Sequence, residues 1–145
     1  PYPQPDSPVA SVTVSTAQEA GWIWDIGLPT RRGTGYVYSS AYTSDDEAER
    51  VLREYLQGFD GSARKISINP GHRESFWYRN CVAVGISAGF IEPLEASALA
   101  LIELSAAMIR DELPVSRQAM EIVAERYNER FRYGWDGIID FLKLH

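Results

Sequence analysis

Residues 80–103 constrain the fold of this chain more than any other stretch. They read NCVAVGISAGFIEPLEASALALIE: an apolar run over residues 81–84, a turn of small residues that begins at Gly85, and a second apolar run that follows Pro93. Proline is well placed in the first turn of a helix, because the N–H that it lacks has no partner there. The pattern predicts a strand, a turn and a helix over residues 94–110, the arrangement with which α/β folds present ligands at a helix N-terminus.

Two carboxylates, Glu92 and Glu95, lie at the predicted start of this helix. One interpretation is a buried carboxylate beside a ligand, because burial raises a carboxyl pKa and such groups gather at active sites. The other interpretation is that both are first-turn glutamates, which the helix dipole stabilises by about 0.3–1 kcal/mol each. An apolar helix that begins with carboxylates suggests a buried functional site rather than a solvated surface.

Three segments near the start of the chain alternate like strands. Their connections are too short for a helical crossover, which predicts an antiparallel meander. In the middle segment Trp22 and Trp24 share one face, and Ile23 and Asp25 share the other. Alternating tryptophans are typical of core packing, with the wall of a pocket or tunnel as the alternative. The predicted strands cover residues 9–16, 20–28 and 34–42.

Ser44 and Glu47 have the spacing of a capping box, which predicts the start of a helix that Gly58 ends. After this helix the pattern predicts two further short strands and, beyond the helix at 94–110, two more helices. The expected strands cover residues 65–68 and 81–84, and the expected helices cover residues 115–131 and the residues from Trp135 onward.

The order of strands, helix, strands and helices predicts an α/β or α+β fold, with one layer of mixed or antiparallel sheet and one layer of helices. We expect residues 1–80 to form part of the sheet with one helix. Residues 81–145 are expected to form the next strand and the helical region. A length of 145 residues fits one domain, so the whole chain is expected to pack as a single compact unit.

The chain carries a formal net charge of −6. This sign argues against nonspecific binding to nucleic acids or anionic membranes, since both need a positive surface. Glu92, Glu95 and Glu103 interrupt the longest apolar stretch, so no membrane span is predicted. We identify no signal peptide and expect a cytoplasmic protein. The start at Pro1 rather than Met, and an end without a helix stop signal, lead us to interpret the chain as a piece of a longer protein.

Common catalytic motifs are missing from the sequence. The single cysteine, Cys81, excludes an intrachain disulfide and is expected to be a small buried hydrophobe. The two histidines form no HxH or HExxH motif, so no metal site is expected. No GxSxG elbow, GxGxxG fingerprint or P-loop occurs. The run Arg31-Arg32-Gly33 is either a solvated hairpin turn or a contact to a phosphate or a carboxylate.

Two motifs resemble those of flavin-dependent halogenases of the tryptophan halogenase family. Residues 21–29, GWIWDIGLP, are similar to the family's W-x-W-x-I-P signature. Residues 90–97, FIEPLEAS, are similar to its F-x-E-P-L-E-S-T segment. The stretch from Asn69 to Gly85 fits the same family, so the resemblance covers nearly the whole chain in the same order and spacing.

The resemblance implies a segment of a flavin-monooxygenase-like fold: part of the substrate-side sheet, the return strand into the flavin domain, and helices beyond it. Family members are several times longer and begin with a GxGxxG flavin-binding unit and a lysine that this chain lacks. They use reduced FAD, supplied by a separate flavin reductase, and oxygen to convert chloride or bromide into hypohalous acid. That species halogenates a small electron-rich aromatic substrate, commonly the indole of tryptophan.

The same resemblance implies roles for individual residues. Glu95 matches the catalytic glutamate, which orients the halogenating species or takes the proton from the ring. Ser97 and Ala98 match the positions whose backbone amides hold the halide, in keeping with the anion preference of a helix N-terminus. Trp22 and Trp24 are expected near the tunnel, where the family motif is held to prevent monooxygenase behaviour. The residues expected to border the flavin are Gly85, Ile86, Pro93 and Leu94.

The motifs also depart from the family pattern. Gly27 replaces the proline of the first motif, and Ala96, Ser97 and Ala98 replace Ser, Thr and Gly in the second. The last two changes matter less where backbone amides bind, since every non-proline residue has one. We expect a subgroup whose substrate differs from free tryptophan. The alternatives are a flavin-dependent aromatic monooxygenase and a truncated, non-catalytic module, and apolar surface left by missing parts favours a homo-oligomer or a complementing chain.

Overall fold

The computed structural model describes residues 8–57 and 61–144, and the chain divides into two compact units. The first unit ends at Ile66 and the second begins at Ser67. This boundary precedes the one expected after residue 80, because the segment that follows Ile66 pairs and packs with the helical part. The packing of both units into one body stays a prediction.

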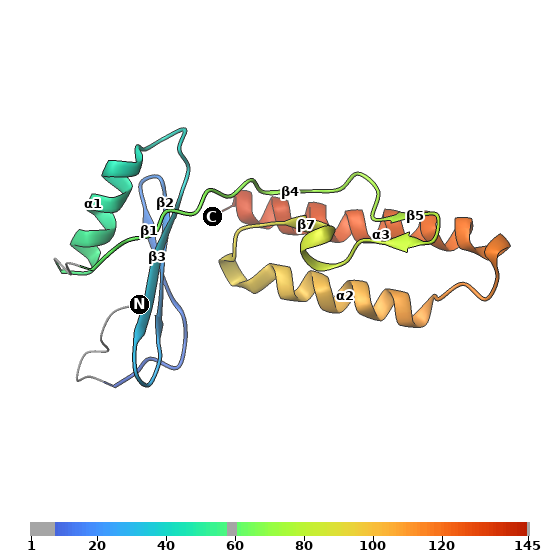
Figure 1. The fold of residues 1–145 in the computed structure, drawn as a ribbon, viewed down its shortest axis with the longest axis horizontal. Coiled ribbons are helices and arrows are strands. Elements are labelled where there is room, and N and C mark those ends of the chain that lie inside the picture. Colours follow the sequence, from blue (N-terminus) through green and yellow to red (C-terminus); the bar gives the residue numbers. More distant parts are fainter. Residues whose placement is uncertain (1–7, 58–60, 145) are drawn as a thin grey trace. The chain divides into compact units, whose positions relative to one another are not determined.

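The first unit is an antiparallel meander with a helix against it (Figure 1). The strand order β1-β2-β3 confirms the prediction from the alternation, although the bounds shift. Strand β1 starts later than residue 9, because its residues find partners in β2 only from Val14 onward. Strand β3 starts before residue 34, because Gly27 pairs with Arg32 across a short turn. The elements are β1 (Val14–Gln18), β2 (Gly21–Gly27), β3 (Arg32–Tyr38) and α1 (Asp45–Tyr55).

The register of β2 with β3 sorts the side chains of β2 as predicted. Ile23 lies opposite Tyr36 and Asp25 lies opposite Thr34, so these residues share one face of the sheet. Trp24 lies opposite Gly35 on the other face. The face of Ile23 and Asp25 packs against α1, and both side chains are buried.

The capping residue of α1 is also confirmed. The Ser44 hydroxyl accepts a hydrogen bond of 3.2 Å from the Glu47 N–H. The helix ends at Tyr55, and the expected stop at Gly58 lies outside the described residues. The strand predicted over residues 65–68 is wrong, because an alternating pattern makes a strand only where a neighbouring strand supplies hydrogen bonds. Here Lys65 forms an ion pair with Asp45 instead.

The second unit consists of two long helices that lie side by side, with short strands along them (Figure 1). Its strands form two small antiparallel pairs, β4 with β7 and β5 with β6. Together with the meander, these elements confirm a fold of helices and antiparallel sheets. The elements are β4 (Gly71–His72), β5 (Trp77–Tyr78), β6 (Cys81–Val82), η1 (Gly85–Ser87), β7 (Gly89–Phe90), η2 (Leu94–Ala96), α2 (Ser97–Asp111) and α3 (Arg117–Lys143).

Three predictions for this unit are wrong. Helix α3 runs through the break expected before Trp135 and is a single helix of 27 residues. It continues because Phe131 and Trp135, one helical turn apart, both enter the core. The apolar strand expected over residues 81–84 shrinks to β6, which pairs only with β5. Cys81 is consequently exposed rather than buried.

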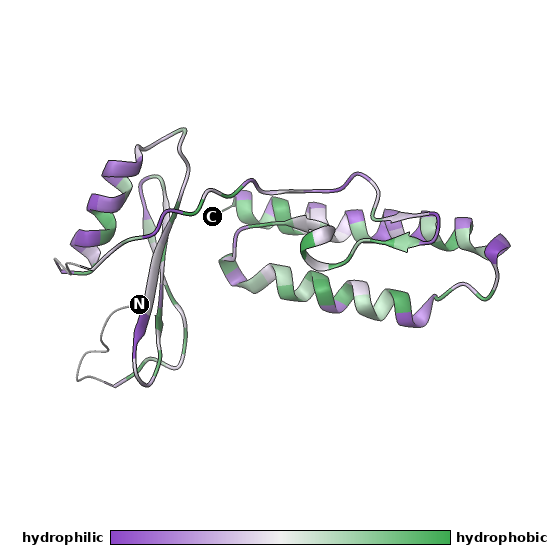
Figure 2. Cartoon of the chain, viewed as in Figure 1, coloured by the Kyte–Doolittle hydropathy of each residue, from purple (hydrophilic) through white to green (hydrophobic). Residues whose placement is uncertain are grey.

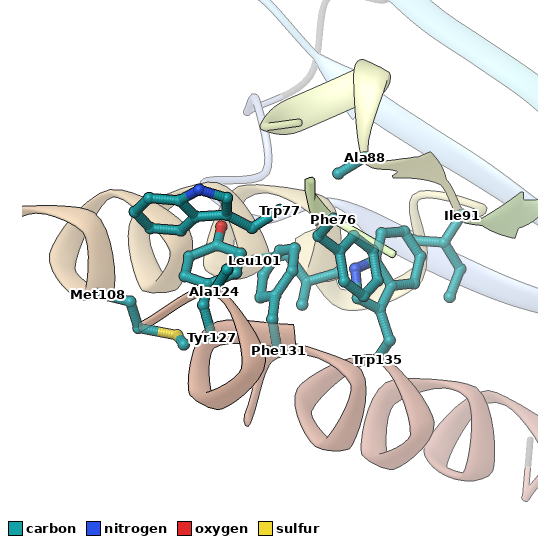
Figure 3. Close-up of a cluster of buried hydrophobic side chains, with 10 residues drawn as sticks. All are labelled: Phe76, Trp77, Ala88, Ile91, Leu101, Met108, Ala124, Tyr127, Phe131 and Trp135. Carbon is teal, nitrogen blue, oxygen red and sulfur yellow. The ribbon is translucent and has the colours of Figure 1, made fainter. Parts of the chain in front are cut away.

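Aromatic rings form the core of the second unit (Figure 3). Phe76 and Phe131 meet edge to face with their ring centroids 4.7 Å apart, and Trp77 and Tyr127 meet likewise at 5.4 Å. Such pairs contribute about 0.5–1.5 kcal/mol beyond their buried area. The buried members of the cluster are Phe76, Trp77, Ala88, Ile91, Leu101, Met108, Ala124, Tyr127, Phe131 and Trp135.

Asn128 of α3 fixes the β5 segment to the helix. Its Oδ1 accepts hydrogen bonds of 2.8 Å from the N–H groups of both Phe76 and Trp77. Its Nδ2 donates to the Trp77 carbonyl at 2.9 Å. One side-chain amide therefore satisfies backbone groups that a neighbouring strand would otherwise pair.

Helix α2 is hydrophobic around much of its surface (Figure 2). Leu99 and Ile102 are 65% and 41% exposed, although both are apolar. This agrees with the apolar surface that the sequence predicts around the helix. Within the described residues no helix combines the length and the apolar character needed to cross a membrane.

Candidate functional site

The start of α2 has an unusual backbone. Glu95 has φ 56° and ψ 20°, and Ala96, the residue that precedes the helix, has φ 54° and ψ 28°. The left-handed region costs a residue with a Cβ roughly 1–2 kcal/mol. Two such residues in succession persist only where the surrounding structure determines them, and strain of this kind gathers at functional sites. The strained pair coincides with the glutamate that the sequence analysis singles out.

Helix α2 also begins without a side-chain cap. Helices α1 and α3 are capped by Ser44 and Ser116, whose hydroxyls accept hydrogen bonds from backbone N–H groups of the first turn. The corresponding residue of α2 is Ala96, which has no such side chain. The first N–H groups of a helix have no partner within the helix and carry the positive end of its dipole. The start of α2 is therefore chemically suited to an anion.

The side chains at this helix start differ in exposure. Glu95 is exposed and Glu92 is half-buried, so neither glutamate at this helix start is a fully buried carboxylate. Ser97 is buried, and its hydroxyl donates to the Leu94 carbonyl at 3.1 Å. This turns the Ser97 side chain inward and leaves only backbone groups of that residue for a ligand. Ala98 is exposed.

An apolar cavity of about 210 Å³ lies beside the start of α2. Three of the residues assigned to the flavin and the halide line it: Gly85, Ile86 and Ala98. The other assigned residues of this unit stand apart from its lining. Leu94 and Ser97 are buried, whereas Pro93 and Glu95 are exposed. The structure thus brings together part of the predicted set.

The cavity wall includes residues that the sequence analysis did not single out. Phe131 and Trp135 of α3 line it together with Gly89 and Ile91. The spacing of Phe131 and Trp135 in the sequence indicates one face of a helix that packs in the core. No nearby residue indicates that this face contacts the turn at Gly85. The cavity is therefore a product of the packing of α3 against the turn.

Local hydrogen bonds fix the turn beside the cavity. Gly85 has φ +59°, a conformation that glycine adopts without steric cost. The Ser87 hydroxyl accepts from the Val84 N–H at 3.0 Å and donates to the Val84 carbonyl at 2.7 Å. The side chain of Ile86 projects from this fixed turn and is 83% exposed. A glycine followed by an exposed apolar side chain suits contact with a flat ring.

In the first unit, a buried charge lies behind the two tryptophans. Asp25 is 4% exposed, and its carboxylate accepts hydrogen bonds from Arg32 on β3, at 2.6 Å from Nε, and from Tyr55 on α1, at 3.1 Å. Thr34 contributes a longer contact of 3.3 Å. We call these four residues the Asp25 cluster. The cluster decides between a solvated turn and an anion contact for Arg32. Its guanidinium donates to a carboxylate of its own chain, that of Asp25.

Electrostatics in the Asp25 cluster favour the charged carboxylate. Burial alone raises the pKa of Asp25, but hydrogen bonds from Arg32, Tyr55 and Thr34, together with the Arg32 charge, outweigh it and lower the pKa. The alternation of β2 already placed Asp25 on the face of Ile23. A charged residue on a buried face indicates that another side chain must pair with its charge. That this side chain is Arg32 follows only from the register of β2 with β3.

Trp22 and Trp24 lie on the opposite face of β2 and are half-buried. Neither belongs to a core like that of the second unit, where the aromatic rings are almost fully covered. Their neighbours on the adjoining strands are small at two positions, with Ala17 opposite Trp22 and Gly35 opposite Trp24. Within residues 8–57 and 61–144, no group of three or more His, Cys, Asp or Glu side chains is arranged to hold a metal ion.

The chain matches the tryptophan halogenase family over residues 2–145. Among curated proteins it is similar to the tryptophan 6-halogenase SttH of Streptomyces toxytricini, with 42% identity over 135 residues. It is also similar to the 7-chloro-L-tryptophan 6-halogenase KtzR of Kutzneria, with 40% identity over 135 residues. Both alignments cover 92% of this chain and 26% of the relative, so the chain spans about a quarter of the length of these relatives.

Solved structures give the same result for the fold. A tryptophan halogenase from Shewanella frigidimarina superposes with a TM-score of 0.91 and 55% identity, over 99% of this chain and 29% of that one. The flavin-dependent halogenase BrvH from Brevundimonas superposes with a TM-score of 0.86 and 37% identity, over 97% of this chain and 29% of that one. The meander, the turn at Gly85 and the two long helices therefore have counterparts in larger proteins.

Proposed function

Because the chain belongs to the tryptophan halogenase family, we propose that it is part of a flavin-dependent halogenase. The parent enzyme attaches chlorine or bromine to an electron-rich aromatic ring, with tryptophan or another indole as the substrate class. The observation that carries the proposal is the start of α2, where Glu95 sits in a strained backbone directly before an uncapped helix N-terminus.

The residues of the second unit fit the two small ligands of such an enzyme. The apolar cavity beside Gly85 and Ile86 suits the edge of a flavin ring, which Pro93 and Leu94 border in the same proposal. The backbone amides of Ser97 and Ala98 suit a halide, since no capping side chain competes for the helix N-terminus. Reduced FAD, when bound, supplies with oxygen the oxidising power that turns halide into hypohalous acid.

Glu95 has the role of the proton acceptor in this proposal. An aromatic ring that gains a halogen must lose a proton, and a carboxylate within reach is a suitable base. The left-handed backbone of Glu95 lies outside the regular geometry of the helix that follows. Trp22 and Trp24 form part of the tunnel wall between the flavin and the substrate, where they separate halogenation from direct oxygenation.

The remaining partners belong to the same proposal. A separate flavin reductase supplies the reduced FAD, and the parent enzyme works in the cytoplasm. The parts of the enzyme that bind the rest of FAD lie outside this chain, so we expect no turnover by the 145 residues alone. Association into a homo-oligomer stays a prediction.

The test is Glu95→Gln in the full-length enzyme, with reduced FAD, bromide and tryptophan or indole as probes. We expect the rate of halogenated product formation to fall by about 10²–10⁴-fold, the usual contribution of a general base, while flavin binding is unchanged. Glu103→Gln is the control, because Glu103 is an exposed carboxylate inside α2, the helix that begins directly after Glu95 and Ala96. Full activity of Glu95→Gln contradicts the assigned role.

Product mass separates this proposal from the monooxygenase alternative. A halogenase adds chlorine or bromine to the ring, and the yield depends on the halide supplied. An oxygenated product that forms equally well without halide contradicts the halogenase assignment.

A further inference from the structure

Gly35 on β3 lies directly against the indole of Trp24. A Cβ placed on Gly35 falls 2.5, 2.6 and 2.7 Å from Cζ2, Cε2 and Nε1 of Trp24. Atoms of these types do not approach so closely without strain, and the nearby atoms belong to a rigid ring. The indole therefore lies flat on the backbone of β3, in space that any side chain at position 35 occupies.

The backbone itself does not require glycine at this position. The glycines with left-handed φ values among the described residues are Gly21, Gly71 and Gly85. Gly35 lies inside a regular strand, where glycine costs roughly 0.5–1 kcal/mol relative to alanine. Contact with the Trp24 ring is thus the feature of the structure that accounts for this glycine.

The Asp25 cluster prevents the sheet from avoiding this contact by a shift of register. Asp25 neighbours Trp24 on β2 but faces the other side, where Arg32 and Thr34 of β3 donate to its carboxylate. A slip of one residue turns every side chain to the opposite face. The hydrogen bonds of Asp25 therefore keep the register in which Trp24 lies opposite Gly35.

We propose that Gly35 is a positioning residue for the halogenation reaction: it holds the Trp24 indole flat against β3 and so sets the shape of the tunnel wall. This inference rests on the proposed function. A small oxidised halide that passes along this wall reaches the substrate only if the passage keeps its shape. A side chain at position 35 tilts the ring into the passage, and more of the oxidised halide escapes before it meets the substrate.

The experiment compares Gly35→Ala with Gly33→Ala in the full-length enzyme. Gly33 is the matched control, because a Cβ there meets Trp24 Cζ3 at 3.4 Å, an ordinary contact, on the same strand and face. The readout is the partition of oxidised bromide between the brominated indole product and an added chemical trap for hypobromous acid. Unfolded enzyme contributes to neither branch, so this ratio is independent of simple loss of stability.

We expect Gly35→Ala to shift the partition toward the trap by roughly tenfold, less than the roughly hundredfold cost of an ångström-scale misplacement at a reacting centre. Gly33→Ala is expected to stay within about twofold of wild type, since its contact is normal. A near-ultraviolet circular dichroism change in Gly35→Ala records the ring movement. A shifted ring with an unchanged partition overturns the inference.

Trp24→Phe keeps the test decisive if Gly35→Ala folds poorly. Phenylalanine has a smaller ring without Cζ2, the indole atom nearest to position 35, so the double variant has more space for the added methyl group. We expect Gly35→Ala to change the partition in the wild-type background and to have no further effect beside Trp24→Phe. An equal effect in both backgrounds overturns the inference. Absence of any halide-dependent product from wild type contradicts the proposed function instead.

Discussion

The two units of this chain bury different chemistry in their interiors. Between the meander and α1, the first unit buries Ile23 of β2, Ala48 of α1 and the charged Asp25. Between α2 and α3, the second unit buries a cluster of five aromatic side chains and further aliphatic residues. A small sheet with one helix can bury few apolar side chains. Directed hydrogen bonds therefore contribute a larger share of the stability of this unit. The helical unit relies on apolar area, which has no preferred direction.

The comparison predicts different responses to mutation and to pH. Loss of a core ring removes area and leaves a cavity, whatever the pH. Loss of one partner from the Asp25 cluster leaves buried polar groups unpaired, and its effect depends on the charge of the carboxylate. Hydrogen exchange measured separately on β2 and α3 distinguishes the units, because it reports local opening.

Phe131→Ala is expected to have the largest effect. Phe131 is 1% exposed and contacts the rings of Phe76, Tyr127 and Trp135. Its truncation is expected to destabilise the second unit by about 3–5 kcal/mol. Urea denaturation and hydrogen exchange of α3 measure the change.

The control for this prediction is Tyr133→Ala on the same helix. Tyr133 is 82% exposed, so its truncation is expected to change stability by no more than about 0.5 kcal/mol. A Phe131→Ala effect as small as that of the control contradicts the aromatic cluster as the source of stability.

Asp25→Asn is expected to have the next largest effect, on the first unit. The amide cannot pair with the Arg32 guanidinium as the carboxylate does, and Arg32 keeps 28% of its side chain exposed. We therefore expect a loss of about 2–3 kcal/mol, below the 3–5 kcal/mol of a fully buried pair. Hydrogen exchange of β2 measures it, with Glu19→Gln as the control at an exposed carboxylate of the same unit.

The pH dependence sharpens the same prediction. The pKa of Asp25 in the folded protein lies below its ordinary value of 3.8. The stability that the cluster contributes is therefore fully present above that value and is lost as the pH falls through the folded pKa. We expect acid to increase the exchange of β2 more than that of α3, and Asp25→Asn to remove this difference. Equal acid sensitivity of Asp25→Asn and wild type in β2 contradicts the assignment to Asp25.

Gly137→Ala is expected to have the smallest effect, and in the stabilising direction. Gly137 lies inside α3, and apart from its chain neighbours and the backbone of its own helix a Cβ there meets no atom within 4 Å. Alanine should stabilise the helix by about 0.5–1 kcal/mol, the usual difference in helix preference. Gly134→Ala is the comparison, because a Cβ there lies 3.2 Å from Leu104 Cδ2 on α2. Thermal denaturation should show a gain for Gly137→Ala and a smaller gain, or none, for Gly134→Ala.

Local patterns in the sequence predicted much of the first unit. The alternation in β2 correctly separated Trp22 and Trp24 from Ile23 and Asp25, because side chains in a strand alternate without help from the rest of the protein. The Ser44 cap was also predictable, since it depends on residues three positions apart. The same pattern at residues 65–68 failed because, among the residues that the structure describes, no strand pairs with it.

At the start of α2, the sequence identified the helix, the carboxylates and the small residues of the turn. It did not reveal the left-handed backbone of Glu95 and Ala96, which residues with a Cβ adopt only under the constraint of their surroundings. Nor did it connect Gly85 and Ala98 with Trp135 of α3 in one cavity. That connection depends on how α3 packs, and local preference carries no information about it.

The sequence by itself determined the order of the elements in the meander and α1, the two faces of β2 and the motifs that indicate the family. Each of these depends on residues close together in the chain, where spacing alone decides which side chains share a face. Only the tertiary structure decided that α3 is continuous, that Arg32 neutralises Asp25, and that Trp24 lies against Gly35. These features depend on contacts between separate elements, and such contacts are fixed by packing and register rather than by the local pattern.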